Sequence, residues 1–180
     1  MNKSNLVFKE VKTPIGVMVF GSSDKGLCLL DFKYRKSFPR ILKRINEYFG
    51  EEITYGTSKF IELAEKELQQ YLQGDLKKFT VPLDIRGKKF QLEVWDALLH
   101  IKYGKTTSYL EIAKKMGRPK AVRAIANANG QNGIAVIIPC HRVIGSDGSL
   151  TGYGGGIAIK KKLIKLESKY GSNKIIDFIK

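Results

Sequence analysis

The 180-residue sequence predicts an α+β fold in two parts: a small antiparallel sheet with helices, then a mainly helical part. Three observations support this prediction. Apolar and polar residues alternate in the first third of the chain, as in half-buried strands. Further along, apolar residues recur every three or four positions, as in amphipathic helices. A Pro-containing stretch at about 77–89 shows neither period. We expect it to be the linker between domains 1–84 and 85–180.

Turn residues separate the expected elements of the first part. Pro14, Gly16 and the turn over 22–26 divide three runs with strand patterns. Pro is favoured at the first turn of a helix and Gly just after the last turn. The expected strands lie around 6–11, 17–20 and 27–32, and the expected helices run from Pro39 to Gly50, from about Ser58 to Gly74, and over 90–101.

Two short helices are expected next in the chain. Ser108 and Glu111 fit a capping box at the start of the first helix, and Gly117 is its expected stop. Pro119 restarts a helix at once, and this helix continues to Gly130. Two short helices joined by a tight turn that contains Gly are typical of a helix-turn-helix.

The second helix of this pair has an unusual composition for a major-groove reader, which normally displays Arg, Asn or Gln. Ala121, Ala124 and Ala128 form a small-residue face, with Arg123 and Asn127 beside it. Such a face would let the helix approach DNA closely, while Arg123 fills or probes the base stack. A packed helical hairpin explains the same alanines, so both interpretations stay open on local sequence.

Charge and cysteine content restrict the partners and the location. Lys and Arg number 32 against 17 Asp and Glu, a net charge of +15 that suits DNA or RNA, although genome composition or a hot habitat explains the same excess. There is no apolar stretch of membrane-spanning length and no signal-peptide pattern. With only Cys28 and Cys140, a disulfide framework is not expected. We expect a cytoplasmic monomer that binds no membrane.

Cys140 and His141 are adjacent, and they follow the apolar run 134–138, which we interpret as an extended strand. A cysteine is nucleophilic only as the thiolate, and a neighbouring base promotes that form. Successive strand residues face opposite sides, so a water relay is expected to join the pair. The alternative is an inert buried thiol beside a core histidine. A Gly-rich loop, 145–156, follows the pair and favours the functional interpretation.

Glu167 lies on the last expected helix, which begins near Ile157. A carboxylate there would orient His141 in the manner of a catalytic triad. A solvated glutamate at a helix end is the alternative interpretation.

These motifs together resemble the O6-alkylguanine-DNA alkyltransferase family. The resemblance covers about Lys88 to Glu167 and extends more loosely into the N-terminal part. It rests on Ile138-Pro139-Cys140-His141-Arg142-Val143, on Arg123-Ala124, on Asn132-Gly133, on Gly152-Tyr153-Gly154-Gly155-Gly156 and on Thr13-Pro14-Ile15-Gly16.

The resemblance implies a DNA repair protein with a ribonuclease H-like N-terminal domain and a helix-turn-helix domain that carries the reactive cysteine. Its partner would be double-stranded DNA carrying O6-alkylguanine, and also O4-alkylthymine. The alkyl group would pass irreversibly to Cys140, once per molecule, because a thioether is a poor leaving group. No cofactor is implied. Some relatives bind zinc, but Cys28 and His100 leave too few ligands for a four-coordinate site here.

The resemblance also gives each matching residue an expected role in the reaction. His141 would act as a base through a water, with Glu167 polarising it and Asn132 ordering the turn. Tyr109 would donate to the departing guanine and help rotate the nucleotide. The expected DNA-binding residues are Arg123, which replaces the extruded base, and Ala121, Ala124, Asn127 and Ala128; the expected base pocket consists of Val143, Tyr153 and Gly154.

Two other classes of protein stay open. A helix-turn-helix regulator, or a lesion sensor without catalysis, would explain the basic charge, although a sensor of this kind lacks the cysteine and no effector domain is evident. A cysteine hydrolase would use Cys140, His141 and Glu167 on an acyl substrate.

Overall fold

The computed structural model describes residues 5–50 and 52–171. The chain forms two compact units. Unit 1 is Met1–Gly87 with Gly133–Ala135, and unit 2 is Lys88–Asn132 with Val136–Lys180. The division therefore falls at Gly87, within the expected linker, where the sequence suggested residue 84. In the described ranges, no helix is both long and apolar enough to cross a bilayer. Of the C-terminal tail, residues 172–180 lie outside the described residues.

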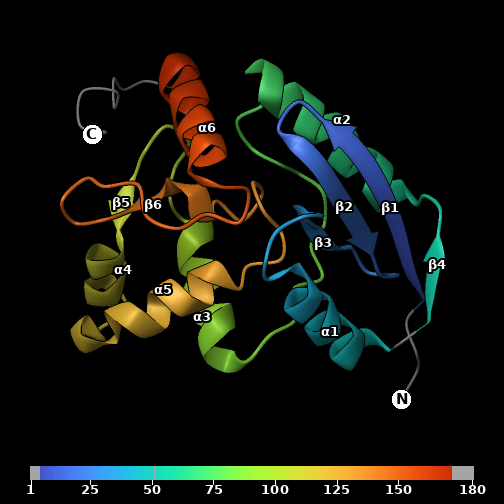
Figure 1. Cartoon of the computed structure of the whole chain (residues 1–180), viewed down its shortest axis with the longest axis horizontal. Coiled ribbons are helices and arrows are strands. Elements are labelled where there is room, and N and C mark those ends of the chain that lie inside the picture. Colours follow the sequence, from blue (N-terminus) through green and yellow to red (C-terminus); the bar gives the residue numbers. More distant parts are fainter. Residues whose placement is uncertain (1–4, 51, 172–180) are drawn as a thin grey trace. The chain divides into compact units, whose positions relative to one another are not determined.

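Unit 1 is built on a four-stranded sheet in the order β3-β2-β1-β4 (Figure 1). The strands are β1 (Leu6–Thr13), β2 (Gly16–Ser22), β3 (Leu27–Phe32) and β4 (Ile53–Tyr55). The first three pair antiparallel, as predicted. β4 was not predicted, and it pairs parallel with β1, so the sheet is mixed and not purely antiparallel. A three-residue strand is too short to show a period of two.

Two helices pack on opposite faces of this sheet. α1 (Phe38–Phe49) buries Ile41 and Ile45 in one cluster with Leu6 and Phe8 of β1. α2 (Lys59–Gln73) reaches the other face, where Lys9 pairs with Glu65. Neighbouring residues of a strand face opposite sides, which separates Phe8 from Lys9. Both helices end at the predicted glycines, Gly50 and Gly74.

Residues 77–88 of the expected linker form no named helix or strand, yet this segment is fixed to unit 1. The buried carboxylate of Glu67 accepts hydrogen bonds from the backbone N–H groups of Thr80 and Val81, at 2.9 and 3.1 Å. Leu83 forms a parallel bridge with Leu27 of β3. Hydrogen bonds to a buried carboxylate order this segment although its sequence has no regular period.

Unit 2 contains the predicted helix-turn-helix. Its elements are α3 (Lys89–Leu99), β5 (Thr107–Ser108), α4 (Tyr109–Lys115), the 3₁₀ turn η1 (Pro119–Ala121), α5 (Val122–Gly130), the 3₁₀ turn η2 (Cys140–Arg142), β6 (Val143–Ile144) and α6 (Ile157–Tyr170). Ser108 Oγ accepts from the backbone N–H of Glu111, as a capping residue does. Trp95 of α3 donates its indole N–H to the carbonyl of Ala128, which fixes α5 against α3.

The expected strand over 134–138 is wrong. Most of this run forms turns, and Val136 has a φ of 72°, which is unusual for a β-branched residue. Only a short part is extended: Leu30 N–H donates to Gly133 O at 2.9 Å, and Ala135 N–H donates to Leu30 O at 2.6 Å. The run is apolar because it is buried, so its composition mimics a buried strand.

The two serine caps of unit 1 give a matched test of helix capping. Ser58 Oγ accepts from the backbone N–H of Ile61, whereas Ser37 forms no side-chain cap on α1. We expect Ser58→Ala to lower the free energy of unfolding by about 1 kcal/mol. Ser37→Ala should change it by less than about 0.5 kcal/mol. Urea denaturation followed by circular dichroism measures both, and equal losses would contradict the assignment.

Candidate active site

The 3₁₀ turn η2 brings Cys140, His141 and Arg142 together at one place in unit 2. The chain turns immediately after Pro139, so the three side chains do not alternate as they would in a strand. Cys140 is 6% exposed and His141 is 0% exposed. α6 packs against η2, and β6 pairs with β5, which directly precedes α4 (Figure 1). Three segments far apart in sequence therefore meet at the cysteine.

Glu167 of α6 is the centre of a buried hydrogen-bond network. One carboxylate oxygen accepts from His141 Nε2 at 2.8 Å. Arg142 binds both oxygens, with Nε–O distances of 3.1 and 2.9 Å. The backbone N–H of Gly104 donates a further bond at 3.0 Å. Glu167 is 2% exposed, so the alternative of a solvated helix-end glutamate is excluded.

The network sets the charge state of both partners. Burial alone would raise the pKa of Glu167, but the bonds from His141 and Arg142 bring it well below its usual range. Burial lowers the pKa of His141, against the opposing influence of Glu167. His141 is therefore neutral at pH 7. Because a carboxylate only accepts, Nε2 carries the ring hydrogen and Nδ1 carries the lone pair that can take a proton.

Asn132 contacts the cysteine sulfur directly. Its Nδ2 donates to the Ile138 carbonyl at 2.9 Å and lies 3.3 Å from Cys140 Sγ. The side chain is 1% exposed. An amide N–H directed at the sulfur favours the thiolate over the thiol, since only the thiolate carries a full negative charge. Asn132 thus both ties the turn and polarises the sulfur.

Two tyrosines flank the site. Tyr109 is the first residue of α4; its hydroxyl is hydrogen-bonded to the Thr151 side chain, and burial raises its pKa. Tyr153 sits edge-on to the His141 ring, with centroids 6.4 Å apart. A phenol with a raised pKa stays protonated at neutral pH, so Tyr109 keeps a proton to donate.

The predicted base-pocket residues have different exposures. Tyr153 and Gly154 are half-buried in the loop before α6, but Val143 is fully buried in the β5–β6 ladder, paired with Thr107. No surface of Val143 is therefore exposed for contact with a base in this structure.

The predicted DNA-binding face of α5 is mostly solvent-facing. Arg123, Ala124 and Asn127 are exposed and Ala121 is half-buried. Ala128 must be removed from this face: it is 3% exposed and its carbonyl is bound by Trp95. Ala128 therefore packs inside the hairpin, as the packed-hairpin interpretation expects.

Two protein-family models match the chain. The ribonuclease-like domain of 6-O-methylguanine DNA methyltransferase matches residues 6–85, and its DNA binding domain matches residues 89–169. A methylated-DNA–protein-cysteine methyltransferase of Methanosarcina barkeri is 46% identical over 157 residues, which is 87% of this chain and 94% of the relative. This chain belongs to the 6-O-methylguanine DNA methyltransferase family. Its enzyme class is methylated-DNA–protein-cysteine methyltransferase, and the ribonuclease-like fold of unit 1 agrees with the predicted fold class.

Two further similarities place this methyltransferase chain in the family over nearly its whole length. The inducible methylated-DNA–protein-cysteine methyltransferase of Bacillus subtilis is 41% identical over 174 residues, covering 94% of this chain and 91% of the relative. A crystal structure of the Mycobacterium tuberculosis protein in complex with DNA has a TM-score of 0.80 at 41% identity, covering 92% of this chain and 94% of that one.

Sequence reasoning gave no role to four residues of the methyltransferase site. Arg142 lies inside the recognised motif, but its bond to Glu167 depends on how α6 folds back. Gly104 has a φ of 72°, and a Cβ there would meet the Glu167 carbonyl at 3.2 Å. Thr151 and Lys160 lie beside Tyr109 and Cys140. Lys160 is seven residues before Glu167, which places both on one helix face, but its burial becomes evident only in the fold.

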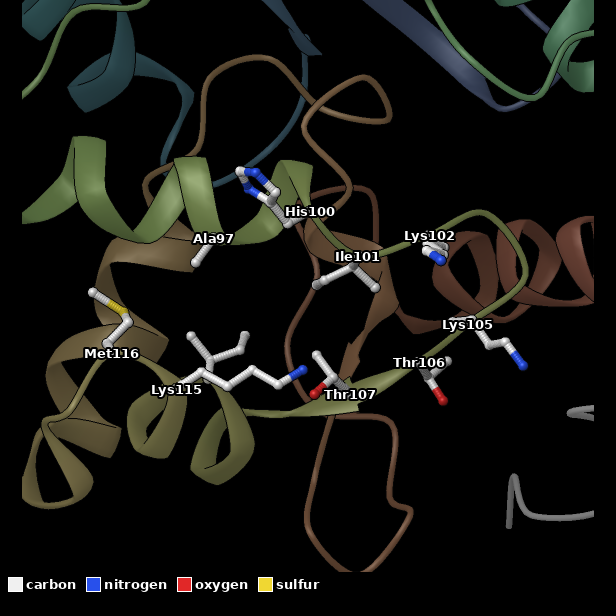
Figure 2. A pocket seen from close by; sticks show the side chains of 10 residues that line it. Ala97, His100, Ile101, Lys102, Lys105, Thr106, Thr107, Lys115 and Met116 are labelled. Atoms are coloured by element: carbon white, nitrogen blue, oxygen red, sulfur yellow. The ribbon is translucent and has the colours of Figure 1, made fainter.

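A separate cavity of about 440 Å³ lies elsewhere in unit 2 (Figure 2). It is lined by the end of α3, the following loop and α4, with Ile101, Ile112 and Met116 among its apolar residues and Lys102 and Lys115 among its cations. None of the predicted site residues lines it. Within residues 5–50 and 52–171, no group of three His, Cys, Asp or Glu side chains could hold a metal ion.

Removing the Glu167 charge tests the network. We expect Glu167→Gln to lower the free energy of unfolding at pH 7 by about 3 kcal/mol, because it leaves Arg142 buried without an anion. Since folding lowers the pKa of Glu167, its contribution is complete above the unfolded-state pKa of about 4.3 and is lost as the pH falls below it.

The difference between wild type and Glu167→Gln should therefore be larger at pH 7 than at pH 3, as measured by thermal or urea denaturation. Glu111→Gln is the matched control, because Glu111 is exposed and its one ion pair among the described residues is with Lys114 on its own helix. Its effect should stay within about 0.5 kcal/mol. Similar losses of unfolding free energy in the two variants would refute the stabilising role of the Glu167 network.

Proposed function

We propose that this protein repairs DNA by direct damage reversal and takes the alkyl group of O6-alkylguanine onto its own Cys140. The observation that carries the proposal is the arrangement around one sulfur: an amide N–H from Asn132, a neutral His141 and a buried carboxylate that fixes the imidazole. Membership of the methyltransferase family supports the same reaction class.

The reaction balances with the groups at the site. The Cys140 thiol gives its proton to His141 Nδ1 through a water, and the thiolate attacks the alkyl carbon. The S–C bond forms as the C–O6 bond breaks, and the electron pair of that bond stays with guanine. The guanine anion then takes one proton, supplied through Tyr109, and leaves the site as ordinary guanine. No metal or group carrier takes part.

The lesion must leave the base stack to reach the sulfur of a cysteine residue that is only 6% exposed. We infer that α5 enters the minor groove and that Arg123 replaces the extruded nucleotide. A solved relative in complex with DNA supports DNA as the partner. O4-alkylthymine carries its alkyl group on an equivalent exocyclic oxygen, so it is a second substrate under the same mechanism.

Each molecule reacts once, because the thioether product is not cleaved by any group at the site. We infer a monomer, since the proposed chemistry uses residues of one chain. We also infer a reducing compartment, the cytoplasm, because the acceptor thiol must not be oxidised before it reacts. A regulator or a lesion sensor would not need the hydrogen bond from the Asn132 amide to the Cys140 sulfur.

The acceptor role is tested by replacing each thiol in turn. We expect Cys140→Ala to abolish methyl transfer from an O6-methylguanine duplex while DNA affinity is largely kept. Cys28→Ala is the control, because burial raises the pKa of Cys28 to about 12 and that thiol stays protonated. Intact-protein mass spectrometry reports the added methyl group. Transfer at the normal rate in Cys140→Ala would refute the role, and repeated ester turnover by the wild type would favour a hydrolase.

The role of Arg123 is tested with two substrates. We expect Arg123→Ala to slow repair of duplex DNA on the order of tenfold or more, equivalent to about 1.4 kcal/mol, because the gap left by the extruded base is no longer filled. Reaction with free O6-benzylguanine needs no extrusion and should change little. Lys120→Ala is the control, as another exposed cation at the same helix start. Equal losses on both substrates would contradict a finger role.

A further inference from the structure

Lys160 of α6 is fully buried, with 0% of its surface exposed. Its ammonium donates to the main-chain carbonyl of Thr151 at 2.5 Å. Among the residues that the structure describes, no carboxylate pairs with it; Glu167, on the same helix, binds Arg142 and His141. Lysine is almost never fully buried without an anion, because desolvating the charge is costly. An ammonium kept in this position at a cost to stability indicates a function.

The groups that face Lys160 belong to the proposed acceptor site. They are Cys140 and His141 on η2, and Tyr109, which Thr151 joins to Lys160 through its side chain and its carbonyl. Lys160 and Glu167 are seven residues apart, which places them about 10 Å apart along one face of α6. α6 packs against η2 with this face. Near the C-terminal end of α6, Glu167 is hydrogen-bonded to His141. Near the N-terminal end of the same helix, Lys160 interacts electrostatically with Cys140.

We propose that Lys160, held by the Thr151 carbonyl, is the counter-charge of the Cys140 thiolate. The inference rests on the proposed acceptor role of Cys140. Lys160 keeps its proton throughout: the thiol proton goes to His141, and the negative charge on sulfur disappears when the S–C bond forms. Before that step, the ammonium attracts the thiolate across a buried site, where such attraction is stronger than in water. Burial lowers the pKa of Lys160 to about 8, and the sulfur opposes this shift.

The test measures the thiolate directly. Absorbance of Cys140 near 240 nm is followed against pH, with the signal of Cys140→Ala subtracted. We expect Lys160→Met to raise the apparent pKa of Cys140 by about one unit or more. Below the thiol pKa, the thiolate population would fall about tenfold while each thiolate becomes about threefold more nucleophilic, so methyl transfer should slow about threefold. Near pH 10 both thiols are ionised and Lys160, with a pKa of about 8, has itself lost its proton, so the rate difference should close there.

Two controls separate this role from a structural one. Lys161→Met removes an exposed neighbouring lysine and should change neither the pKa nor the melting temperature. Lys160→Arg keeps the charge and should retain a low thiol pKa. Lys160→Met itself should keep the wild-type melting temperature at a pH where the Cys140 thiol is protonated, because Lys160 then has no anion to balance and an apolar side chain replaces it without loss.

An unchanged thiol pKa in Lys160→Met would overturn the inference, as would a loss of transfer that is equal at all pH values and accompanied by a lower melting temperature. If Lys160→Met does not fold, Lys160→Gln is compared with Lys160→Arg, and equal thiol pKa values in the two would also overturn it. A wild-type protein that acquires no methyl group would instead refute the proposed function, whatever the titration shows.

Discussion

The arrangement of the second unit depends on the hydrogen bonds that one buried carboxylate, that of Glu167, accepts. Glu167 receives bonds from His141, from Arg142 and from the backbone of Gly104, so α6, η2 and the loop after α3 are all fixed at one point. A carboxylate in such a place is stable only while its partners are present. The same contacts that hold three segments together therefore also fix which imidazole nitrogen can take a proton.

The charges of this region are divided between two tasks. Arg142 balances the charge of Glu167, while burial lowers the pKa of His141 and keeps it neutral, as the proposed base must be. The remaining polar groups, the Asn132 amide and the Lys160 ammonium, face the sulfur. Both ends of α6 contribute, one to the imidazole and one to the thiol.

The sequence predicted the elements that carry strong local signals. Helices with clear periods and glycine stops were found to within a few residues, and the predicted capping role of the Ser108 side chain was confirmed. β4 was not predicted because a strand of three residues is too short to show an alternation of apolar and polar side chains. The run 134–138 was taken for a strand because burial gives turns and strands the same composition.

The candidate site was predictable in its motif residues but not in its partners. Cys140, His141 and Glu167 come together in the structure, whereas Ala128 packs inside the hairpin because it faces Trp95. Lys160 was invisible because a lysine in a lysine-rich helix reads as a surface residue, and only the fold shows which one is enclosed. Tertiary packing, not local pattern, decides such cases.

The burial of the reactive thiol has a consequence for the protein before it meets a lesion. Under the proposed single-turnover reaction, each molecule can repair one lesion, and a peroxide that oxidises its Cys140 sulfur makes that molecule unable to react. Formation of a sulfenic acid needs an accessible thiolate. Because only 6% of Cys140 is exposed, the residues that enclose it also protect the unreacted thiol from oxidation.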